Sequence, residues 1–293
     1  MKMNESQKLI IGGLLALLAG VCFSSGGFFI RSVTLDHWEI LFFRCLFASV
    51  SILFYLLITK RKDTLSSIIK PGWPGLSIGL MTAWAVIAYV IAIQTTLVAN
   101  VLAIMTTSTI IVTLLSGPLL GERVPIRTWL AVACGVSGIG LMLSEAMGGG
   151  QLIGNFLAFT IALAIAGQTI VARRFKSSEM IPSVFLATVV VGIISLPNAV
   201  PFESTYRDIL ILATFGIIQL ALALILFFSA ARFLPAPTLI LVVLIDALLA
   251  PLWVWIGFNE IPNLLTFIGA SIILIGVGSN SFFAIWELKF FRK

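Results

Sequence analysis

Residues 121–141, GERVPIRTWLAVACGVSGIGL, have a weaker counterpart near the end of the chain, residues 259–279, NEIPNLLTFIGASIILIGVGS. In each stretch a glutamate, Glu122 or Glu260, stands shortly before a proline and an apolar run that contains several glycines. When the two glutamates are aligned, two glycines of each run fall at the same spacing. This internal similarity predicts that the chain consists of two related halves.

The composition predicts that these halves lie in a membrane. Of the 293 residues, 60% are hydrophobic and only 10% are charged, whereas an ordinary soluble domain has about a quarter charged residues. A bilayer is the solvent that accepts such a surface, and a helix needs about 20 mostly apolar residues to cross it. Ten apolar runs satisfy or approach this length: residues 9–30, 40–58, 75–93, 98–120, 128–143, 152–171, 181–200, 209–230, 238–258 and 264–283.

The distribution of basic residues supports this count and predicts the orientation. If the ten runs all span, fifteen of the 18 Lys and Arg residues fall on one side, and only Arg31 and Arg207 fall on the other. Basic residues collect on the cytoplasmic side of membrane proteins. A missed or extra helix would exchange the sides of all later loops, so the asymmetry tests the count as well. Both termini are therefore predicted to be cytoplasmic, in a multi-pass protein of the inner membrane.

An odd number of spans in each half requires that the halves enter the membrane from opposite sides. The predicted fold is thus all-α and polytopic, with ten transmembrane helices in two inverted five-helix repeats, residues 1–147 and 151–293. Inverted repeats are typical of secondary transporters, in which the substrate binds between the halves near the middle of the membrane.

In these features the chain resembles the EamA domains of the drug/metabolite transporter superfamily. The resemblance lies in the five-plus-five layout, the GERV turn between spans four and five with its NEIP counterpart, and Arg44 early in span two. It implies a secondary transporter, most often an exporter of amino acids or other small metabolites. It also implies a central cavity lined by the first, third, fourth, sixth, eighth and ninth helices.

Several residues are predicted to shape or gate the bundle. Glu122 and Glu260 each come just before the next helix, where a carboxylate can accept hydrogen bonds from free backbone N–H groups; a role in gating or ion coupling is the alternative. Pro118 and Pro251 fall inside spans four and nine, where proline favours a kink, as a static bend or a hinge. The resemblance suggests that Arg44 is a structural anchor, with substrate contact as the alternative.

Polar side chains within the spans are the candidate binding residues, because they usually face the bundle interior or a cavity. Asp246 lies near the middle of span nine, where desolvation favours its protonated form, so it is predicted to carry a proton or to pair with a cationic substrate, against the alternative of a structural acid. An aromatic wall would suit a cationic or aromatic ligand. The other candidates are Ser24, Ser25, Trp84, Tyr89, Asn100, Gln168 and Gln219.

The sequence offers no support for catalysis, a cofactor or a metal. The three cysteines lie inside apolar runs, the single histidine, His37, stands in a short loop, and no Walker motif is present. The predicted partners are a small-molecule substrate, the lipid bilayer and, if Asp246 titrates, protons; nucleic acid is not among them, and a monomer and a homodimer both remain open. The alternatives to alternating-access export are a facilitative or channel-like permease and an intramembrane enzyme.

Overall fold

The computed structural model describes residues 5–69, 72–96, 98–143 and 152–258, together with residues 264–265, 268–269, 271–272, 275–276 and 279. The first half contains α1 (Glu5–Ser24), α2 (Gly26–Arg31), α3 (His37–Lys60), η1 (Arg61–Asp63), α4 (Thr64–Ile69), α5 (Gly72–Thr95), α6 (Val98–Met105), α7 (Thr107–Leu120) and α8 (Ile126–Leu143). The second half contains α9 (Leu152–Arg174), α10 (Ile181–Ala199), α11 (Tyr206–Thr214), η2 (Phe215–Leu222), α12 (Ala223–Ala231), α13 (Ala236–Val243) and α14 (Ile245–Phe258). No described residue lies in a strand, which confirms the all-α prediction.

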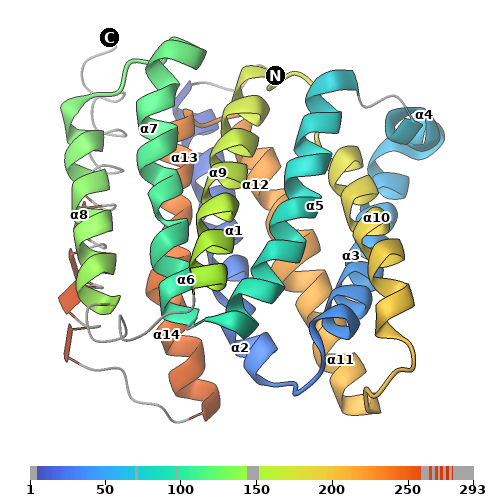
Figure 1. The fold of residues 1–293 in the computed structure, drawn as a ribbon. Coiled ribbons are helices and arrows are strands. Elements are labelled where there is room, and N and C mark those ends of the chain that lie inside the picture. The colour runs from blue at the N-terminus through green and yellow to red at the C-terminus, as the bar shows by residue number, and fades with distance from the viewer. Residues whose placement is uncertain are drawn as a thin grey trace.

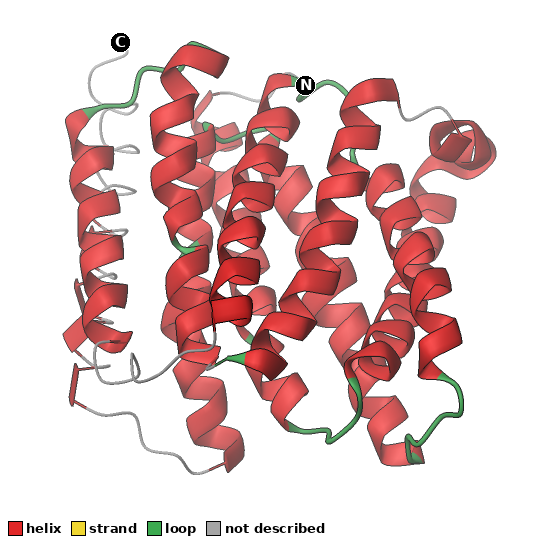
Figure 2. Ribbon diagram, in the orientation of Figure 1, coloured by secondary structure: helices red, strands yellow, loops and turns green. Residues whose placement is uncertain are grey.

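The long helices run side by side between two ends of the bundle, where the described loops lie (Figures 1 and 2). At one end, the top in Figure 1, lie the connections at residues 61–69, 121–125 and 175–180. We refer to this end as the basic end, because Lys60, Arg61, Arg123, Arg173 and Arg174 lie in or beside these connections. The connections at residues 32–36 and 200–205 lie at the opposite end (Figure 1). The described loops therefore alternate between the two ends as the predicted spans require.

Seven helices within the described residues are long and apolar enough to cross a membrane, and Thr107–Leu120 is a shorter apolar helix. Large apolar side chains remain exposed along them, among them Phe54, Leu80, Phe156 and Ile193. An apolar surface of this extent is suited to contact with lipid rather than with water. Most of the predicted tenth span lies outside the described residues, so the count of ten helices stays a prediction.

Helices of the two halves pack extensively against one another. The most extensive contacts join α5 to α9 and α3 to α10, and α1 of the first half packs against α12, α13 and α14 of the second. Each half therefore contributes helices to the centre of the bundle, and a cavity at the centre has walls from both.

Candidate substrate cavity

A cavity of 160 Å³ lies within the bundle and is lined by residues of both halves. Its wall is mainly apolar and includes the aromatic rings of Phe23, Tyr89 and Phe227. Cavities of this kind, apolar with a few converging polar groups, are the usual form of small-molecule sites. The polar or charged residues that line it are Ser24, Arg44, Thr82, Tyr89, Thr106, Ser108, Thr109, Gln168, Gln219 and Asp246.

Three of the spans that line this cavity have a single irregular residue beside it, at which the backbone keeps right-handed helical angles. The first span is interrupted at Ser25, between α1 and α2; the fourth at Thr106, between α6 and α7; and the ninth at Leu244, between α13 and α14. Thr106 and Leu244 themselves line the cavity.

The eighth span is modified in another way, by the π-helical turns of η2 between α11 and α12. π-Helical insertions are rare and are often found at functional sites. η2 contains Phe215, Gly216 and Gln219, and it packs against α3. A Cβ atom on Gly216 would overlap the backbone oxygen of Arg44 and would lie 3.2 Å from the backbone nitrogen of Ala48. Glycine therefore lets η2 pack directly on the backbone of α3 at Arg44.

Arg44 lies in the cavity wall, where η2 and α3 meet. Its side chain is 2% exposed, and its Nη2 donates a hydrogen bond of 2.7 Å to Oε1 of Gln219. The guanidinium carbon lies 4.3 Å from the ring centroid of Phe215 and 5.6 Å from that of Tyr89. The Nε and Nη1 atoms of Arg44 are buried and have no hydrogen-bond partner among the described residues. Arg44 is thus a buried cation, and two of its nitrogen atoms have no hydrogen-bond partner among the described residues.

Tyr89 and Gln219 are brought to Arg44 by close packing against α2. A Cβ atom on Gly26 would overlap the hydroxyl of Tyr89 and would lie 3.0 Å from Nε2 of Gln219. Tyr89 also lies within electrostatic range of both Arg44 and Asp246. The tyrosine therefore lies within reach of the two charged groups of the cavity.

Asp246 is the only carboxylic acid among the described residues that line the cavity. It occupies the first turn of α14, directly after the break at Leu244, and its side chain is half-buried. A carboxylate at a helix N-terminus is stabilised by the positive end of the helix dipole. Further along the same helix, Trp253 donates a hydrogen bond of 2.7 Å to the hydroxyl of Ser24 in α1.

The structure brings most of the predicted binding residues together and excludes two of them. Those that line the cavity are Ser24, Tyr89, Gln168, Gln219 and Asp246. Ser25 is outside it and donates to the backbone oxygen of Cys22, and Trp84 is 45% exposed and donates to the hydroxyl of Thr160. The side chains of Asn100 and Pro251, and all of Glu260, lie outside the described residues.

Other lining residues were missed by the sequence analysis. Thr106, Ser108 and Thr109 belong to a run of four hydroxyl residues in the middle of span four, which was the available signal. Thr107, within this run, donates to the backbone oxygen of Ile104, and such local bonds compete with helix continuation. The irregularity at Thr106 falls within this run, and α7 continues through Pro118 without interruption.

Glu122 caps a different helix from the one predicted. Its Oε1 accepts a hydrogen bond of 2.6 Å from Nε of Arg173, and its Oε2 accepts one of 2.9 Å from the backbone nitrogen of Ala236. The capped N-terminus is therefore that of α13, not that of the following helix, α8. The reason is tertiary, because α7 packs against both α9 and α13 and brings their ends to the glutamate. Glu122 joins the two halves at the basic end.

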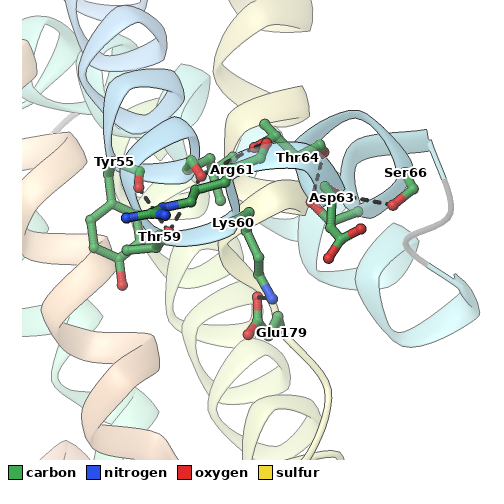
Figure 3. A network of polar contacts seen from close by, with 10 residues as sticks. Tyr55, Thr59, Lys60, Arg61, Asp63, Thr64, Ser66 and Glu179 are labelled. Atoms are coloured by element: carbon green, nitrogen blue, oxygen red, sulfur yellow. Dashed lines mark hydrogen bonds and ion pairs between the residues drawn. The ribbon is translucent and has the colours of Figure 1, made fainter.

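Further polar contacts hold each end of the bundle. At the basic end, Nζ of Lys60 lies 2.6 Å from Oε2 of Glu179 and joins α3 to the loop before α10 (Figure 3). At the opposite end, the buried carboxylate of Glu39 accepts hydrogen bonds from the backbone nitrogens of Glu203 and Ser204, the shortest of 2.8 Å.

Comparison with known proteins finds the same layout elsewhere. The model of the EamA-like transporter family matches residues 10–144 and again residues 152–282. The chain is 26% identical over 272 residues to the pseudopaline exporter CntI of Pseudomonas aeruginosa, strains PAO1 and UCBPP-PA14, which is 90% of this chain and 93% of the relative. One solved structure, described only as a crystal structure of a protein, superposes with a TM-score of 0.77 at 16% identity, over 93% of this chain and 97% of that one; this likeness concerns the fold alone.

Proposed function

Because the chain belongs to the EamA-like transporter family, we propose that it exports a small metabolite across the inner membrane by alternating access. Membership confirms the resemblance found in the sequence and the polytopic membrane fold. The names of the family and of the relative point to a transporter rather than an enzyme. The observation that carries the mechanism is a central cavity walled by both halves.

The contacts at the basic end support a description of this conformation as closed toward the cytoplasm. The charge-assisted pair of Glu122 with Arg173, and its bond to Ala236, hold α7, α9 and α13 together at that end. The cavity residues of α3 and α5, Arg44 and Tyr89, lie in the portions of those helices nearer the opposite end. Release of the Glu122 contacts and rocking of the halves would open the cavity to the cytoplasm for loading.

The substrate proposed for this cavity is an amino acid or a related amine or aromatic solute. Its lining supports that class, since aromatic rings stand beside one cationic and one acidic group. The similar exporter CntI carries pseudopaline, which supports the direction of transport rather than this substrate class.

Asp246 is the proposed proton-coupling residue. It is the acidic residue that lines the cavity, and the other ionisable residues among the described lining are Arg44 and Tyr89. Facilitated movement of solute without protons is the alternative, in which Asp246 serves as counter-ion or as helix cap.

Counterflow in proteoliposomes tests the function. Vesicles loaded with a panel of unlabelled amino acids and amines should accumulate the matching labelled solute without ATP, and the solute should be recovered chemically unchanged. An imposed pH gradient should drive net uptake by the wild type and not by Asp246→Asn. Equal gradient-driven uptake by both would reject proton coupling through Asp246, while the absence of exchange for every solute would count against export itself.

A further inference from the structure

We propose that Arg44 and Gln219 form the site that binds a carboxylate group of the transported solute. This inference rests on the proposed function and names the part of the solute that the cavity recognises. Arg44 is thereby assigned to substrate binding rather than to the structural anchor predicted from the resemblance.

The charge balance around Arg44 favours the binding of an anion. A guanidinium stays protonated in proteins, so its charge cannot be removed by loss of a proton. No carboxylate of the described residues forms an ion pair with Arg44, although both Arg173 and Lys60 have one. A buried cation without a counter-ion is strongly unfavourable, particularly within a membrane. A solute anion would supply the missing charge.

Arg44 and Gln219 have N–H groups without a hydrogen-bond partner among the described residues. One nitrogen of Arg44 is engaged by Gln219, and Nε and Nη1 have no partner among the described residues. The Oε1 atom of Gln219 accepts from Arg44, which turns its amide nitrogen away from the guanidinium; that nitrogen has no hydrogen-bond partner in the described part of the chain. Two side chains from opposite halves thus bring N–H groups without a hydrogen-bond partner to one place in the cavity wall, and because Nε and Nη1 of Arg44 are covered, a carboxylate reaches them after a small turn of the guanidinium.

Close packing restricts the movement of the residues around Arg44. Phe215 packs on the guanidinium, and Gly216 places η2 against the backbone of Arg44 itself. Gly26 holds Nε2 of Gln219 and the hydroxyl of Tyr89 close to α2. Donors that are fixed before binding lose little entropy when the anion arrives. Such preorganisation distinguishes this arrangement from an arginine that merely fills space.

The charges that line the cavity favour a carboxylate over other anions. Arg44 is the only cationic side chain among the described residues that line the cavity, so a doubly charged group such as phosphate would bring a second negative charge that no cation there balances. A singly charged carboxylate balances Arg44 alone, and a basic group elsewhere in the solute would face Asp246. The cavity as a whole is therefore matched to a solute with one carboxylate and one cationic group.

Matched compounds test the proposal on the purified full-length protein. For each of several amino acids, the melting temperature is measured with the free acid, its primary amide and the corresponding amine without the carboxyl group, and with inorganic phosphate. At least one acid should raise the melting temperature, whereas its amide, its amine and phosphate should not. Equal shifts from acid and amide would overturn the proposal, as would the absence of a shift from every acid tested.

Two substitutions at the site separate binding from folding. Gln219→Glu places a carboxylate beside Arg44, so it should keep or raise the melting temperature of the free protein while it weakens acid binding by at least about tenfold. Arg44→Gln should weaken acid binding to a similar degree. Arg207→Gln, at an exposed residue outside the cavity, is the matched control and should leave binding unchanged.

These experiments distinguish a failure of the carboxylate site from a failure of the proposed export function. If Gln219→Glu binds acids as the wild type does, the carboxylate site is rejected. If counterflow instead reports exchange of amines or amides that is insensitive to Gln219→Glu, export stands and the carboxylate site falls. If no solute exchanges but acids still bind through Arg44, the site stands and the proposed function falls.

Discussion

Arg44 shows how the neighbours of one residue decide its role. Its sequence position, early in the second span, was compatible with a side chain that reaches outward or pairs with an acid. The structure instead buries it against Phe215 and pairs it with Gln219, 175 positions away. Nothing local in the sequence signals this contact, since it depends on the π-helical turns and on Gly216.

Gly26→Ala tests the packing that holds this site together. The new methyl group would overlap the hydroxyl of Tyr89 and press on the amide of Gln219. Overpacking of this kind costs about 1–3 kcal/mol, so solute exchange should fall about tenfold. Gly13→Ala is the control, because nothing lies within 4 Å of its added Cβ. Counterflow rates that fall equally in both variants, or in neither, would contradict the assignment.

At the scale of the helix, the irregular positions of the spans lie beside the cavity. The first, fourth and ninth spans break at Ser25, Thr106 and Leu244, and the eighth contains η2. Pro118 and Pro251 lie within α7 and α14 rather than at these positions. Their role as hinges stays a prediction.

Gly216→Ala tests the fit of η2 against α3. An added Cβ atom would overlap a backbone atom of Arg44, which cannot move aside as a side chain tip can. We expect a loss of about 1–3 kcal/mol, visible as a lower melting temperature in detergent. Gly117→Ala, in α7, has open space around the added Cβ and should be neutral or slightly stabilising, by up to about 1 kcal/mol. A Gly216→Ala protein as stable as Gly117→Ala would show that η2 is not constrained at this point.

Glu122→Gln tests the closure of the basic end. Replacing the carboxylate weakens the bonds to Arg173 and Ala236, and loss of a charge-assisted hydrogen bond costs about 1.5–3 kcal/mol. The conformation open at the basic end should therefore become more populated, measured as faster modification of a cysteine introduced at Thr109 by a reagent added from that side. Glu179→Gln removes only the more exposed pair with Lys60 and should change the rate little. Similar rates for the two variants would rule out a special role of Glu122 in closure.

The whole molecule gives independent support to the proposal of two equivalent halves. If each span is exchanged for its equivalent in the other half, the contact of α5 with α9 becomes that of α12 with α1. The same exchange converts the contact of α3 with η2 into that of α10 with α5, and both pairs are present. We propose that a two-fold axis in the membrane plane relates residues 1–147 to residues 151–293.

Labelling from the two sides of the membrane tests this orientation. In a background without native cysteine, Glu203→Cys should react with an impermeant maleimide on intact cells, because Glu203 is exposed at the end opposite the basic residues. Ser66→Cys, exposed at the basic end, should react only after permeabilisation. Reporter fusions should place both termini in the cytoplasm. Labelling of both positions from the same side would refute the orientation.

Much of the fold was accessible from sequence, and part of the cavity was as well. Polar residues within apolar spans are rare, so Ser24, Tyr89, Gln168, Gln219 and Asp246 could be selected before their contacts were known. Trp84 and Tyr89 show what the sequence could not predict about the cavity. They lie five residues apart on α5, yet one faces the lipid side of the bundle and the other the cavity.

Two kinds of physical constraint explain why the sequence predicted the fold but only part of the binding site. The hydrocarbon core acts on every residue of a span, so length, composition and the placement of basic residues were enough to predict a helical membrane protein and its spans. The binding site depends on distant pairs instead. Which face of each helix points inward, where helices break, and that Gln219 rather than an acid meets Arg44 follow only from the packing of the two halves, because these contacts join residues with no local relation in the chain.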